Sequence, residues 1–103
     1  MRDYPAVANP DRCPTHPGEL LREDVLPATG KSKTEIAALL GISRQHLHDI
    51  LQERKPVSPA TAVRLAKLFG TSPDSWVGMQ SAFDTWHAKR NVDVSGIPTI
   101  RAA

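Results

Sequence analysis

The stretch SKTEIAALLGISRQHLHDIL, residues 32–51, decides the fold of this chain. Ser32 is followed three residues later by Glu35, a capping box in which each side chain accepts the backbone amide hydrogen of the other residue. A helix is therefore expected to begin directly after Ser32. Gly41 should end it, because glycine takes a positive φ without steric cost, and Ser43 should cap a second helix.

The apolar residues of this stretch recur at helical spacing in both expected helices. They are Ile36, Ala37, Leu40, Ile42, Leu47 and Ile50. The small residue Ala37 lets the second helix cross closely, and Gly41 lets the chain turn within about three or four residues. This pattern predicts a helix-turn-helix within an all-α domain. The alternative is a helical hairpin in a small bundle that binds no nucleic acid.

The outward face of the second helix distinguishes these two interpretations. Arg44, Gln45 and His48 point outward, and Asp49 is a further candidate for this face. Arg and Gln carry donors and acceptors that match the guanine and adenine edges in the major groove, and the first residues of the second helix reach the bases in this motif. We therefore predict that Arg44, Gln45 and His48 read bases, with a phosphate as the alternative contact of His48.

Cations and hydroxyl groups that flank the motif are candidate contacts to DNA phosphates. They are Lys31, Ser32, Lys33, Ser43, Arg54 and Lys55. A single lysine is more often a solvated surface charge, but a cluster beside such a motif favours DNA. The formal net charge is only +2, so the expected positive field is local and does not cover the whole molecule.

The composition predicts one small domain. The chain has 103 residues and is 40% hydrophobic, which is enough for a core but not for a large one. No apolar run approaches the roughly 18 residues that span a bilayer, and the first 14 residues lack the apolar segment of a signal peptide. Cys13 is the only cysteine, which excludes an internal disulfide. We therefore expect a cytoplasmic protein with no membrane contact.

Helix start and stop signals predict three further helices. Each begins at a proline, which is favoured at the first helical position, and they cover about 17–26, 59–69 and 73–89. Pro27 and Gly30 should end the first of them. With the two helices of the motif, this makes a five-helix domain over 15–89, preceded by a flexible arm over 1–14 and followed by a tail over 90–103.

The last helix carries a stripe of large apolar residues, Trp76, Met79, Phe83 and Trp86, at steps of three, four and three. The stripe either closes the core of its own domain or leaves a patch that two subunits bury against each other. Trp76 and Phe83 suit the core, and Met79 and Trp86 are the candidate dimer contacts. A two-fold dimer places its recognition helices ~34 Å apart and requires a palindromic site, so we predict a homodimer on double-stranded DNA.

The four histidines and the cysteine do not indicate an enzyme or a metal protein. Cys13 and His16 supply only two ligands in the arm, whereas a zinc site takes four. His46 and His48 are two residues apart on one helix and point to different faces. His16 should cap or pack locally, and His87 should lie at the surface. No catalytic residue, metal site or cofactor is predicted.

Three segments now support a resemblance to a known family. HPGELLREDVL at 16–26, the motif at 32–51 and SPATAVRLAKLFGTSPDSWVGMQSAFD at 58–84 closely resemble the HigA-type antitoxins, which belong to the phage-repressor-like helix-turn-helix class. The resemblance implies a five-helix domain that dimerises through its C-terminal region. It also implies that the chain represses its own promoter and neutralises a HigB-type toxin, a RelE-like ribonuclease that cleaves messenger RNA.

Two features depart from the resemblance. Many relatives carry a small residue, often glycine, in the turn where this chain has Glu53, and the tail after Asp84 differs from the commonest version.

The resemblance alone carries the prediction of toxin binding. An acidic helix could meet a basic ribonuclease, so Glu19, Glu23 and Asp24 are the candidate toxin contacts, with a solvated helix face as the alternative. Two other functions stay open. One is a stand-alone transcriptional repressor without a toxin, and the other is a protein-interaction module that has lost DNA binding.

Overall fold

The computed structural model describes residues 11–101, which form helices and no strand. The elements are α1 (Pro17–Leu20), η1 (Leu21–Val25, a π-helical segment), α2 (Leu26–Thr29), α3 (Lys33–Leu40), α4 (Arg44–Leu51), α5 (Pro59–Phe69) and α6 (Pro73–Asn91). Because α1, η1 and α2 follow one another without a break, they make one continuous helix. The predicted all-α fold of five helices is thereby confirmed.

The predicted starts of the later helices are confirmed by their caps. Ser32, Ser43, Ser58 and Ser72 each precede one of α3 to α6. Each hydroxyl oxygen accepts the amide hydrogen of the residue three positions on, at distances of 2.9 to 3.2 Å. These bonds satisfy amides that have no partner inside their own helix.

The predicted end of the first helix is confirmed for Gly30 and wrong for Pro27. Pro27 lies inside α2, and the helix continues to Thr29 before Gly30 ends it. In a regular α-helix the proline ring would clash with the carbonyl group four residues earlier. Here the π-helical turn η1 directly precedes α2, and the amide of Leu26 bonds to the carbonyl of Leu21, five residues back. This wider turn gives the proline room, so the helix passes through it.

The core lies between the first helix, the motif and α5. Its side chains are almost fully buried: Leu21, Leu26, Ile36, Ala37, Leu40, Leu47, Ile50, Leu51, Val57, Ala62, Leu65, Ala66 and Trp76. The apolar residues predicted for the motif are among them, except Ile42, which is half-buried. The buried position of Trp76 shows that the first residue of the α6 stripe closes the domain's own core.

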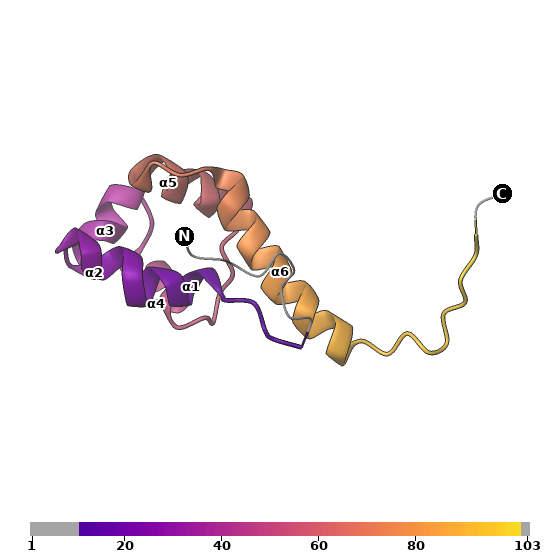
Figure 1. Cartoon of the computed structure of the whole chain (residues 1–103). Coiled ribbons are helices and arrows are strands. Elements are labelled where there is room, and N and C mark those ends of the chain that lie inside the picture. The colour runs from indigo at the N-terminus through magenta and orange to yellow at the C-terminus, as the bar shows by residue number, and fades with distance from the viewer. Residues whose placement is uncertain (1–10, 102–103) are drawn as a thin grey trace, which may run out of the picture.

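α6 extends beyond this core. It packs on α5 and, further along, on α1, and then runs away from the body of the molecule (Figure 1). It ends at Asn91, two residues after the predicted end. Residues 92–101 continue as an exposed segment. Most of the predicted arm lies outside the described residues. Among the described helices, none combines the length and apolar character that crossing a membrane requires.

Candidate nucleic-acid interface

The outer face of α4 presents the residues that the sequence singled out for base contact. Arg44 and Gln45 are exposed and His48 is half-buried, whereas Leu47 and Ile50 on the opposite face are buried in the core. Because α4 begins at Arg44, directly after its cap Ser43, Arg44 and Gln45 occupy its first turn. This is the turn whose side chains reach base edges in a helix-turn-helix.

α3 adds a cation to this face. Lys33, the first residue of α3, lines a surface hollow of about 600 Å³ together with Arg44, Gln45 and His48. The structure therefore brings one predicted phosphate contact next to all three predicted base contacts. Since a lysine ammonium and a guanidinium both bind phosphate oxygens well, the hollow suits a polyanion.

The other predicted phosphate contacts lie on the segments that precede α3 and follow α4, and at the cap of α4. Lys31 and Ser32 line a second hollow of about 310 Å³, in which Lys33 and Arg22 also take part. Arg54 and Lys55 are exposed on the segment that follows α4.

The predicted phosphate contacts Ser32 and Ser43 also cap helices. The hydroxyl oxygens of Ser32 and Ser43 accept amide hydrogens of their own helices. Only their hydroxyl hydrogens remain to be donated to a phosphate. Glu35 closes the capping box, because its carboxylate accepts the amide hydrogen of Ser32 at 3.0 Å. These hydrogen bonds from Ser32 hold the pKa of Glu35 below its ordinary value.

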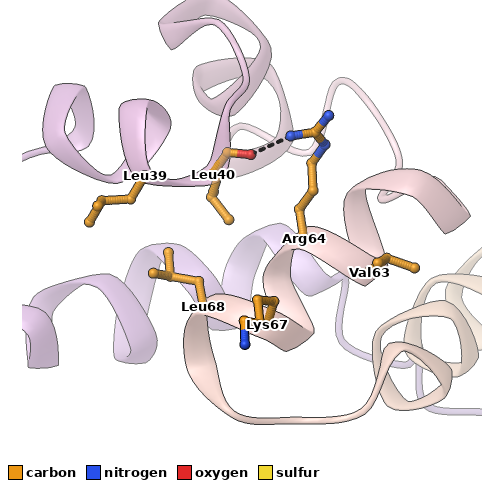
Figure 2. Close-up of a pocket in the computed structure, with 6 residues that line it drawn as sticks. All are labelled: Leu39, Leu40, Val63, Arg64, Lys67 and Leu68. Carbon is orange, nitrogen blue, oxygen red and sulfur yellow. Dashed lines mark hydrogen bonds between the residues drawn. The ribbon is translucent and has the colours of Figure 1, made fainter.

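The turn between α3 and α4 depends on Gly41 and on a side chain from α5. Gly41 has a φ of 73°, which an L-residue with a side chain rarely adopts. Arg64 of α5 donates from Nη1 to the carbonyl oxygen of Leu40 at 2.8 Å (Figure 2). This bond satisfies a carbonyl at the end of α3 that has no partner inside the helix.

The far end of α4 is held by the first helix. Arg22 donates from Nη1 to the carbonyl oxygen of Leu51 at 2.6 Å and pairs with the carboxylate of Glu53 at 3.3 Å. The hydrogen bonds that Arg22 donates to Glu23 and Glu53 raise the pKa of Arg22 above its ordinary value. Glu53 has a φ of 61°. The residue therefore occupies the left-handed turn for which the resemblance expects a small residue.

Gly18 sets the distance between the first helix and α4. A Cβ atom built on Gly18 would overlap the carbonyl oxygen of Ile50 in α4. Only glycine permits this close approach of the two backbones. The position of α4 on the core therefore depends on a residue outside the motif.

Sequence reasoning also missed Gln80, which fixes the segment after α4. Gln80 of α6 is 5% exposed. Its Oε1 accepts the amide hydrogen of Val57 at 2.8 Å, and its Nε2 donates to Asp84 at 3.0 Å. A polar residue four positions after Trp76, within an apolar stripe, was the available signal. No comparable pattern in the sequence predicts the contacts of Arg22 and Arg64.

The candidate dimer residues lie on α6 and are not among the buried core residues. Met79 and Trp86 are both half-buried. The Nε1 of Trp86 is shielded from solvent and has no hydrogen-bond acceptor among residues 11–101. The guanidinium of Arg90 lies over the indole ring, 3.5 Å from its centroid.

The candidate toxin contacts share one exposed surface of the first helix. Glu19, Glu23 and Asp24 are all exposed. The carboxylate of Glu23 also forms an ion pair with Arg22 at 2.8 Å. That carboxylate is therefore less available to another protein than its exposure suggests.

A separate apolar groove of about 480 Å³ lies between α3 and α5 (Figure 2). Leu39 of α3 and Val63 of α5 line it and are each 57% exposed. Its other lining residues are Leu40, Arg64, Lys67 and Leu68. The groove contains none of the predicted site residues.

His16 and His87 both make contacts within the domain. His16 is buried and caps α1, because its Nδ1 accepts the amide hydrogen of Gly18 at 2.9 Å. Burial lowers the pKa of His16 below its ordinary value. His87 does not lie free at the surface as predicted: it is half-buried and packs on Phe83 and Trp86. Cys13 lies 3.6 Å from its Nε2. Within the described part of the chain, no three potential ligand side chains come together around a metal position.

A family model described as helix-turn-helix matches residues 21–76, which is more than half of the chain. Among curated proteins, virulence-associated protein I of Dichelobacter nodosus is 37% identical over 76 residues. That match covers 74% of this chain and 70% of the relative.

Two solved structures share both the fold and a substantial part of the sequence. An addiction module antidote protein of the HigA family from Coxiella burnetii superposes with a TM-score of 0.76 and 33% identity, over 87% of this chain and 100% of that one. Antitoxin GraA in complex with its operator superposes with a TM-score of 0.80 and 34% identity, over 94% and 99% of the respective chains.

Proposed function

This chain belongs to the helix-turn-helix family, in its HigA-like branch, and on this premise we propose that it is an antitoxin. It binds its own operator as a dimer and represses its operon, and it neutralises a HigB-type, RelE-like toxin that cleaves messenger RNA. The proposal includes no catalysis by this chain. The observation that carries the DNA-binding part is the hollow in which Lys33 joins Arg44, Gln45 and His48.

The base-reading role rests on Arg44, Gln45 and His48. Two bidentate contacts would each discriminate between bases by ~1–3 kcal/mol. Replacing Arg44 and Gln45 together by alanine should therefore strongly reduce the preference for the operator over scrambled DNA. Fluorescence anisotropy on both duplexes measures this difference. An equal loss of affinity on both would show that the two side chains touch only phosphates.

The phosphate-binding role rests on Lys31, Ser32, Lys33, Ser43, Arg54 and Lys55. Lys33→Ala should lower affinity on every duplex and reduce the slope of log K against log salt by about one unit. Lys89→Ala is a matched control, because Lys89 is exposed near the end of α6, away from the motif. A slope that stays the same in Lys33→Ala would remove Lys33 from the phosphate contacts.

The dimer contacts are Met79 and Trp86 of α6. Their partial exposure supports a partner surface there. A Met79→Glu variant should dissociate the dimer in multi-angle light scattering while keeping its helical circular dichroism. A wild-type chain that is monomeric at high micromolar concentration and binds DNA one-to-one would contradict this part of the proposal.

Co-expression with the small reading frame beside this chain tests the antitoxin part. We expect growth rescue and a complex that co-purifies, and charge reversal at Glu19, Glu23 and Asp24 should weaken that complex. If the neighbouring frame is not toxic and no complex forms, the chain is a stand-alone repressor. If specific DNA binding is also absent, it is a protein-interaction module.

A further inference from the structure

The predicted base-reading face contains one hydrogen bond between its own side chains. Gln45 donates from Nε2 to Oδ1 of Asp49 at 2.9 Å. The two residues are four positions apart on α4 and therefore lie on the same side of the helix. Asp49 is also held from its other oxygen, since Oδ2 lies 3.8 Å from Nζ of Lys55. Its side chain is only 15% exposed, so it is a fixed acceptor beneath an exposed amide.

The chemistry of this pair determines which way the amide points. An ionised carboxylate accepts hydrogen bonds and cannot donate one, whereas an amide has a donor end and an acceptor end. The nitrogen of Gln45 must therefore face Asp49, and Oε1 must lie on the other side. Without Asp49 the amide could turn over by half a rotation at little cost, because its terminal torsion is broad and roughly two-fold.

The orientation of the amide determines which base edge it matches. Adenine presents a donor at N6 beside an acceptor at N7, and guanine presents acceptors at both O6 and N7. The nitrogen of Gln45 has two hydrogens. One is used by Asp49, and the other can donate to N7 while Oε1 accepts from N6. A turned amide would offer its donor at the place of N6, which suits O6 of guanine.

We propose that Asp49 is a positioning residue that holds the Gln45 amide in one orientation and so makes Gln45 discriminate adenine from guanine. This inference rests on the proposed function, because it assigns a specificity to the same DNA-binding face. Lys55 contributes by holding the second carboxylate oxygen in addition to its expected contact with phosphate.

The test uses the full chain and a library of random DNA duplexes. Sequencing of the selected duplexes gives the preferred site, and anisotropy titrations with single base replacements then give relative Kd values. We expect an adenine preference of about tenfold at one position of each half-site. Gln45→Ala should remove it there only. Asp49→Asn should reduce it to about twofold or less, because Asn can present either an oxygen or a nitrogen to Gln45.

A double-mutant cycle separates positioning from a charge effect. Asp49→Asn also removes a negative charge near the DNA, which should raise affinity for all duplexes and leave their ratios unchanged. In the Gln45→Ala background, Asp49→Asn should no longer change any base preference. Circular dichroism of each variant checks that α4 is intact.

The outcomes separate the inference from the proposed function. A wild-type chain without any base preference would contradict the proposed function itself. A wild-type preference for adenine that depends on Gln45 but survives Asp49→Asn would overturn the role of Asp49. A Gln45→Ala variant that keeps every preference would overturn the inference as well, because Gln45 would then read no base.

Discussion

A residue in the left-handed region flanks each end of α4. The one before the helix is a glycine, and the one after it is a glutamate. Gly41 before the helix has a φ of 73°, and Glu53 after it has a φ of 61°. The leading end follows mainly from local sequence, with a glycine turn and a serine cap, and one tertiary bond from Arg64 to Leu40 supports it. The trailing end is held by tertiary contacts, because Arg22 bonds to both Leu51 and Glu53. Similar backbone geometry can thus arise from different causes.

The strongest test of this comparison is Gly18→Ala, at the trailing end. The added Cβ would overlap the backbone carbonyl of Ile50, which cannot move without shifting α4. Overpacking of this kind costs ~1–3 kcal/mol or more, and we expect a value at the upper end. Urea unfolding followed by circular dichroism measures it. Gly78→Ala is a matched control, because its added Cβ has no atom within 4 Å apart from its chain neighbours and the backbone of its own helix. A Gly18→Ala variant as stable as wild type would show that the first helix does not position α4.

The next largest effect is expected at the leading end, from Gly41→Ala. An alanine at positive φ costs ~1–2 kcal/mol. Its Cβ would also lie 2.6 Å from Nη1 of Arg64. Because the arginine side chain is flexible, it can move aside and lose its bond to Leu40. Thermal unfolding should show a lower Tm, and Arg64→Ala should add little further loss in the Gly41→Ala background. Full additivity would contradict this coupling.

A smaller effect concerns pH and again the trailing side, where His16 caps the helix that supports α4. Burial lowers the pKa of His16 in the folded state, so the unfolded chain binds the proton more readily. The free energy of unfolding should therefore be highest above pH ~6.5, and should fall as the pH drops through that value and on toward the folded-state pKa. His16→Asn keeps a capping oxygen and should flatten this part of the curve. An equal slope in both proteins would mean that other groups cause it.

The smallest net effect is expected for Glu53→Gly. It relieves the left-handed conformation, worth ~1–2 kcal/mol, and loses an ion pair with Arg22 that contributes at most ~1 kcal/mol. Glycine also gives the unfolded chain more conformational freedom, which offsets a further ~0.4–1 kcal/mol, so we expect a net gain in stability below ~1 kcal/mol. Glu53→Ala is the matched comparison, since it loses the pair and keeps the strain, and it should destabilise. If both variants destabilise equally, the ion pair outweighs the backbone conformation.

Local signals predicted most of the fold. The capping box at Ser32 and Glu35 sets the start of α3, and the glycine at position 41 sets its end. Each signal involves no more than four consecutive residues, and both are present in the structure as expected. Pro27 misled the prediction because the π-helical turn before it removes the clash that normally ends a helix. That turn has no comparable mark in the sequence.

The candidate interface was predictable only in part. The outward position of Arg44 and Gln45 follows from the buried pattern of α4, and so does their place in its first turn. The bond from Arg22 to Leu51 spans 29 residues and that from Arg64 to Leu40 spans 24. Spacing along the chain cannot reveal which long side chain folds back onto a particular carbonyl, because that depends on how the helices pack.

The bond from Arg64 to Leu40 has a consequence for anyone who wants to transplant the motif into another scaffold. Residues 32–51 look like a self-contained cassette, but the carbonyl at the end of α3 receives its donor from α5. An isolated cassette would leave that carbonyl to water and give the glycine turn a wider range of shapes. The smallest portable unit that retains this geometry therefore extends through α5, to Phe69.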